Sequence, residues 1–122
     1  MEGIFPSNMG GNMNAIKEDV EKLVQKELES ANQRFPMFRS DHEGAAVIFE
    51  EIEETESEMR AVNRHFASTW YLVKQNERIK AYSYINKLKN SAVNLACEAI
   101  QVAAMAQKFI DSQKEREKSE DN

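Results

Sequence analysis

The chain has 122 residues, of which 41% are hydrophobic and 30% charged, and its formal net charge is −5. This length and balance suit one soluble globular domain. The negative charge argues against a protein whose main task is to coat DNA or RNA, because such proteins present a basic face. No apolar run approaches the roughly 18 residues of a membrane span, and the first residues lack the basic and apolar regions of a signal peptide. We therefore expect a cytoplasmic protein without a nucleic-acid or membrane partner.

Helix breakers are few and lie early in the chain. There are four glycines and two prolines, and both prolines precede residue 40. The long stretches without a breaker predict an all-α fold. Residues 1–12 hold three of the glycines and are predicted to be a flexible leader, and residues 114–122 are predicted to be a charged, flexible tail. Residues 13–113 then form a single helical domain.

The first and last helices are predicted from their apolar spacing. The first spans about residues 14–32 and ends before Pro36, because proline disfavours helix at the preceding residue. The turn between the later helices is placed at residues 74–78. The last helix then runs over about residues 77–113.

The second helix has the clearest start. Ser40 followed by Glu43 is a capping box ahead of an apolar run, so a helix is predicted from about Asp41. The pattern supports either one helix to about Val73 or a break near residues 65–69.

The second and third helices each carry an apolar stripe whose steps alternate between four and three, the spacing of helices that pack along their length. On the second helix the stripe is Ile48, Ile52, Thr55, Met59, Val62, Phe66, Thr69 and Val73. On the third it is Ala81, Ile85, Leu88, Ala92, Leu95, Ala99, Val102, Ala106 and Phe109. Cys97 is expected to be buried beside it. Three such helices bury a modest core, so we expect homo-oligomerisation to complete it, as a homodimer or homotetramer.

The second helix is also rich in glutamate, with six in eleven residues. Glu51 and Glu54 fall on one line beside the apolar stripe, and Glu58 lies one turn further along that line. On the third helix, Glu98 and Gln101 form a matching line beside the stripe. If the two helices pack through their stripes, these two lines face each other.

A cluster of three like charges in such a seam is unfavourable without compensation, which a divalent cation supplies. Ligands that are all oxygen favour Mg²⁺ or Mn²⁺ over zinc. Such a cation can hold and polarise a polyphosphate while a carboxylate activates water. The alternative for the upstream glutamates is a solvated helix face, and the alternative for Glu98 is an ion pair with a basic side chain.

Two segments, HEGAAVIFEEIEETESEM (42–59) and NLACEAIQVAAMAQKF (94–109), resemble the MazG-like branch of the all-α nucleoside triphosphate pyrophosphohydrolases. The lead-in FPMFRSDHEG (35–44) is similar to that of small bacterial and phage members. The resemblance covers roughly residues 30–110. It implies a MazG-like helical bundle that assembles as a dimer or tetramer, and Mg²⁺-dependent cleavage of a nucleoside triphosphate to a monophosphate and pyrophosphate.

The family signature is Glu-x-x-Glu on one helix and Glu-x-x-Asp on the next. Carried over, it gives Glu51 and Glu54 as catalytic carboxylates and metal ligands, with Glu98 as a third ligand. Gln101 stands where the family has Asp, and its neutral amide adds a ligand oxygen but no charge. The family's basic and amide residues for phosphate have no clear counterpart after Phe109. Two functions stay open: an active pyrophosphohydrolase, or a catalytically degenerate relative that binds nucleotide or metal or acts as a helical interaction module.

Overall fold

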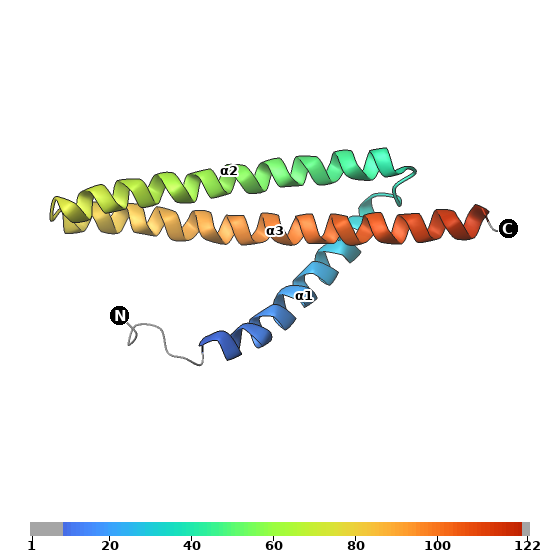
Figure 1. Ribbon diagram of the computed structural model, residues 1–122, viewed down its shortest axis with the longest axis horizontal. Helices are drawn as coiled ribbons and strands as arrows, with labels where there is room; N and C mark the ends of the chain where they lie inside the picture. The colour runs from blue at the N-terminus through green and yellow to red at the C-terminus, as the bar shows by residue number, and fades with distance from the viewer. Residues whose placement is uncertain (1–8, 121–122) are drawn as a thin grey trace.

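The computed structural model describes residues 9–120, with side chains from residue 16, as three helices without a strand in that range (Figure 1). The helices are α1 (Met9–Arg34), α2 (Asp41–Lys74) and α3 (Arg78–Glu120). α2 and α3 run antiparallel as a long hairpin, and α1 crosses α3 obliquely near the open end of the hairpin (Figure 1). The predicted all-α fold is confirmed.

α2 is one continuous helix, so the alternative of a break near residues 65–69 is wrong. Its start is capped as predicted: Ser40 has an extended backbone, and its Oγ accepts a hydrogen bond from the backbone N–H of Glu43 at 3.1 Å. The turn after α2 falls within the predicted residues 74–78. Asn76 lies there with a left-handed φ of 58°, which asparagine tolerates, and its N–H donates to a carbonyl in the last turn of α2.

α1 begins earlier than predicted, at Met9 rather than near residue 14. Residues 9–12 of the predicted leader are therefore helical, whereas residues 1–8 lie outside the described part of the chain. Glycine costs a helix about 1 kcal/mol per residue relative to alanine but does not forbid it. The prediction from glycine content therefore placed the start of α1 too late in the sequence.

α3 continues through residues 114–120 of the predicted flexible tail, instead of ending before them; residues 121–122 lie outside the described range. Contacts with the connection between α1 and α2 hold this end of the helix. The backbone N–H of Phe38 donates to Ser112 Oγ at 3.0 Å. Arg116 donates to the Phe38 carbonyl oxygen at 2.9 Å and also to the first carboxylate of α2.

The buried core lies where α1 crosses the hairpin. Its buried apolar members are Leu28, Ala31, Phe38, Ala104 and Met105. Gly44 is buried beside them in the first turns of α2. A Cβ at this position would lie 2.6 Å from Phe109 Cδ2 and 2.9 Å from Phe38 Cδ2, so only glycine allows this close approach.

The seam between α2 and α3 is the set of buried and half-buried positions that recur at heptad spacing along both helices. On α2 these are Gly44, Ile48, Glu51, Thr55, Glu58, Val62, His65, Thr69 and Leu72. On α3 they are Ala81, Tyr84, Leu88, Ser91, Leu95, Glu98, Val102, Met105, Phe109 and Ser112. Glutamates therefore lie within the seam rather than beside it.

The predicted stripes were wrong at every second position, by one residue. On α2 the seam takes Glu51, Glu58, His65 and Leu72 in place of Ile52, Met59, Phe66 and Val73. On α3 it takes Tyr84, Ser91, Glu98 and Met105 in place of Ile85, Ala92, Ala99 and Ala106. Heptad spacing identifies a stripe but does not decide which of two adjacent lines faces the neighbouring helix. Cys97, predicted to be buried, is exposed.

Large apolar residues that lie one position after seam residues form an exposed surface, which we term the apolar face. Its large members are Phe49, Ile52, Met59, Phe66, Trp70 and Val73 on α2 and Tyr82, Ile85 and Ile110 on α3. Each follows a seam residue by one position, and because the helices are antiparallel this step turns both helices toward the same side. A groove of about 450 Å³ lies on this side between Ile52 and Ile110.

α1 covers part of the opposite side of the hairpin, where a pocket lies between all three helices. None of the described helices combines the length and the apolar character that crossing a membrane requires.

Candidate metal centre

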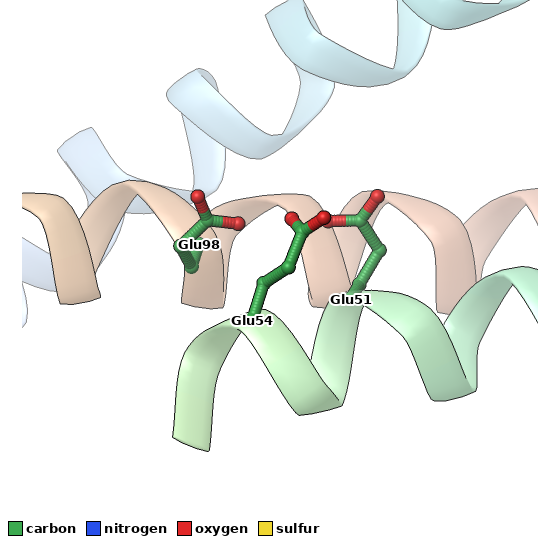
Figure 2. A group of neighbouring side chains, drawn as sticks. All are labelled: Glu51, Glu54 and Glu98. Carbon is green, nitrogen blue, oxygen red and sulfur yellow. The ribbon is translucent and has the colours of Figure 1, made fainter. Parts of the chain in front are cut away.

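Three glutamates converge midway along the hairpin. Glu51 and Glu54 lie one turn apart on α2, and Glu98 projects toward them from α3 (Figure 2). Each offers one carboxylate oxygen, and these three oxygens lie within 4.8 Å of one another. Helical spacing of three on α2 and the antiparallel register with α3 produce this arrangement. The structure thus brings together the three glutamates that the sequence singled out.

Two of the oxygens in this group lack a hydrogen-bond partner within the described chain. Glu51 Oε2 and Glu98 Oε2 are both buried from solvent, and no donor reaches either of them. A buried, unpaired carboxylate oxygen is costly, and the cost grows when further carboxylates lie beside it. These two oxygens mark the place where a cation or proton is required.

The surroundings of this group favour protonated carboxyls when no cation is present. Burial raises the pKa of Glu51 from its usual value, and the negative charge of Glu54 raises it further. Burial also raises the pKa of Glu98, where the next cause is a hydrogen bond with Glu54 that requires a proton between the two carboxylates. Glu58 adds a smaller increase through its charge, but its carboxylate is not one of the three that converge.

The donor set fits a hard divalent cation. All three converging atoms are carboxylate oxygens, which suit Mg²⁺ or Mn²⁺ better than zinc. Two oxygens on opposite sides of one Mg²⁺ lie about 4.2 Å apart, twice the usual Mg–O distance. Spacings of up to 4.8 Å are close to that value, so small side-chain movements suffice for Glu51, Glu54 and Glu98 to share a cation.

Gln101 lies next to this group. It is half-buried on α3, and it lines the pocket on the α1 side of the hairpin together with Glu51. Its amide oxygen is therefore a neutral ligand candidate at the edge of the three-carboxylate cluster, on the side where the pocket opens.

The pocket has a volume of about 550 Å³ and is lined by residues from α1, α2, α3 and the connection after α1. It contains a feature that the sequence reading missed: Lys108, whose side chain is almost completely buried. The signal was present in the sequence, because Lys108 interrupts an apolar run and lies two turns after Gln101 on the same helical line.

The chain matches no protein-family model, no curated protein and no solved structure. Function is therefore inferred from the site itself and from the two short motifs that contain it.

Proposed function

We propose that the protein is an Mg²⁺-dependent nucleoside triphosphate pyrophosphohydrolase of the MazG-like kind, with Mn²⁺ as a substitute cation. One observation carries the proposal: Glu51, Glu54 and Glu98 bring carboxylate oxygens within 4.8 Å of one another, although they come from two helices far apart in the sequence. The two motifs that resemble the family are the segments that supply these residues.

The roles of the residues follow from their exposure. Glu51 and Glu98 hold buried oxygens without partners, so they are cation ligands. Glu54 is exposed and bridges the two, so it is both a ligand and the carboxylate best placed to accept a proton from attacking water. The bound cation supplies charge neutralisation and polarisation of the phosphate. Attack by water then breaks the bond between the α- and β-phosphates and leaves a nucleoside monophosphate and pyrophosphate, with the proton of the water accepted by Glu54.

The neutral Gln101 sets the strength of this site. With three carboxylates the site holds less negative charge than one with four, so it binds a divalent cation more weakly. The neutral Gln101 is also the reason for the alternative function, in which a catalytically degenerate protein binds nucleotide or metal without turnover.

The apolar face supports a further part of the proposal, assembly with a second copy of the chain. Large apolar side chains on this face are about half or more exposed, among them Phe49 at 61%, Phe66 at 54% and Trp70 at 52%. Burial of such side chains against a second copy would stabilise the assembly.

The composition of the face favours a second copy of the chain as the partner. On α2 the face carries large apolar side chains, whereas on α3 it is mainly alanine: Ala92, Ala96, Ala99, Ala103 and Ala106. Large side chains of one copy pack well against a strip of small ones on another, because the small residues allow close approach. We therefore propose a homodimer, or a homotetramer built from it, in which α2 of each copy packs on α3 of the other.

The test of the enzymatic proposal is pyrophosphate release from a panel of NTPs and dNTPs with Mg²⁺ or Mn²⁺. We expect release from at least one nucleotide, and loss of at least about 100-fold in kcat/KM for Glu51→Gln and Glu98→Gln. Glu53→Gln, an exposed neighbour on α2, is the matched control and should retain activity. Turnover that is unaffected by either site substitution would contradict the assignment.

A further inference from the structure

Lys108 is the most buried lysine of the described chain, with 2% of its surface exposed. It lies on α3 and lines the pocket beside Glu51 and Gln101. Its ammonium lies 5.0 Å from the centre of the Phe38 ring, and no carboxylate among residues 16–120 lies within ion-pair distance of it. Its environment disfavours the charge: burial lowers the pKa of Lys108, and the carboxylate of Glu43 opposes this only partly.

A buried ammonium without an ion-pair partner is costly, and an anion in the pocket would remove that cost. The pocket is also large enough for part of a ligand, at about 550 Å³. A second cation, Arg34, lies at its edge, where the guanidinium is 5.8 Å from the centre of the exposed Phe35 ring.

The charges around the pocket restrict which anion fits. Among the described residues that line it, two are basic, Lys108 and Arg34, and four are carboxylates: Glu27, Glu43, Glu50 and Glu51. A free polyanion would be repelled by this surplus of negative charge. If a divalent cation binds at the three-glutamate cluster together with the anion, the cation supplies the missing positive charge.

We propose that this pocket binds the phosphate chain of the metal-bound ligand and that Lys108 is the residue that contacts it. The inference rests on the proposed function, because it requires the cation at Glu51, Glu54 and Glu98. It extends that function by giving the phosphate chain a binding side chain within α3, seven residues beyond Gln101. The phosphate chain extends from the cluster past Gln101 to Lys108.

A structural alternative for Lys108 is that its charge only offsets nearby glutamates. The two roles differ in what they affect. A phosphate contact controls the affinity for the anion and leaves cation affinity unchanged. An internal counter-ion controls folding stability and cation affinity, because its removal makes the cluster more negative.

The experiment is calorimetric titration of the full chain, first with Mn²⁺ alone and then, in saturating Mn²⁺, with inorganic pyrophosphate or an α,β-methylene nucleoside triphosphate. The variants are Lys108→Met, which keeps the length of the side chain without its charge, and Lys108→Arg, which keeps the charge. Lys89→Met, an exposed lysine on α3, is the matched control.

We expect Lys108→Met to lose about tenfold or more in affinity for both anions, while Mn²⁺ affinity stays within about twofold. Lys108→Arg should recover much of the anion affinity, and Lys89→Met should match the unmodified protein. Unchanged anion affinity in Lys108→Met with normal Mn²⁺ binding would overturn the role of Lys108 and leave the proposed function intact. A loss confined to the nucleotide analogue would place Lys108 at the nucleoside and also overturn it. Failure of the unmodified protein to bind Mn²⁺ would instead overturn the proposed function, and this inference with it.

If Lys108→Met does not fold, NMR of the unmodified protein with ¹³C-labelled lysine gives the answer. Addition of pyrophosphate in saturating Mg²⁺ should shift the Cε resonance of Lys108 and leave that of Lys89 unchanged. An unmoved Lys108 resonance at saturating pyrophosphate would overturn the inference.

Discussion

Glu51 on α2 and Glu98 on α3 meet within the hairpin seam, and each holds one buried oxygen that no donor of the described chain satisfies. Most seam positions of a helical hairpin are apolar, because burial of apolar surface drives the association. Here the pair places two carboxyls in a half-buried, low-dielectric region next to Glu54. Such a pair destabilises the metal-free fold, and the cation that we propose would offset this cost.

The metal-free protein should lose stability as pH rises. The pKa values of Glu51 and Glu98 are raised above the usual 4.5, so the folded chain keeps protons that the unfolded chain releases near that pH. Between 4.5 and the raised pKa values the folded state binds more protons, and its free energy of unfolding therefore falls with increasing pH. Thermal unfolding in a chelator across this range measures the effect.

Glu98→Gln is the control for this pH dependence. It removes one of the titrating groups, so its unfolding temperature should fall less steeply with pH than that of the unmodified protein. It should also be the more stable of the two at neutral pH without metal, because a charge is removed from the cluster. Identical slopes for the two proteins would show that Glu98 has an ordinary pKa.

Gln101→Asp should strengthen the metal site. A fourth carboxylate beside Glu51 adds a charged ligand, and we expect Mn²⁺ affinity to increase about tenfold, with faster pyrophosphate release. Without metal the same variant should be less stable, because a fourth like charge joins the cluster. Asn90→Asp, on an exposed part of α3, makes the same change in charge and should alter neither property. Unchanged Mn²⁺ affinity in Gln101→Asp would place residue 101 outside the site.

Gly44→Ala tests the packing of α2 on α3 near the core. In an unhindered helix this change stabilises by about 1 kcal/mol. At position 44 the added Cβ meets Phe109 at 2.6 Å, so we expect a loss of about 1–3 kcal/mol in the free energy of unfolding. Denaturant unfolding measures it, and Phe109→Leu in the same chain should recover part of the loss. A stabilised single variant would contradict the close approach.

Phe66→Asp tests the apolar face as the surface between copies. Phe66 is 54% exposed at the middle of this face, and a charge there opposes burial against a second copy. Light scattering should give two or four times 14.0 kDa for the unmodified protein and about one such mass for the variant. Arg64→Glu, an exposed change on the opposite side of α2 from this face, should keep the assembled mass. A monomeric unmodified protein at high concentration would contradict the assembly.

Much of this arrangement can be predicted from the sequence, and the exceptions have physical causes. The cap at Ser40 and the turn near Asn76 are local, so side-chain chemistry within a few residues specifies them. The convergence of Glu51 with Glu98 follows from heptad spacing on two antiparallel helices.

Which of two adjacent lines of residues on each helix faces the neighbouring helix could not be predicted in the same way. Ile52 and Glu51 both belong to wide faces with heptad spacing, and a hydrophobic count favours Ile52. The choice depends on how the helices pack on one another in the whole fold, which is information outside a single helix. The burial of Lys108 could not be predicted for a related reason, because it depends on α1 and Phe38, which lie 70 or more residues away in the sequence.

The most direct test of the metal centre is a crystal structure grown with Mn²⁺, with anomalous scattering collected for the unmodified protein and for Glu98→Gln. The account predicts one anomalous peak bound by carboxylate oxygens of Glu51, Glu54 and Glu98 in the unmodified protein, and its loss or marked weakening in the variant. No peak at saturating Mn²⁺, or Glu98 in an ion pair with a lysine or arginine away from the two α2 glutamates, would contradict it.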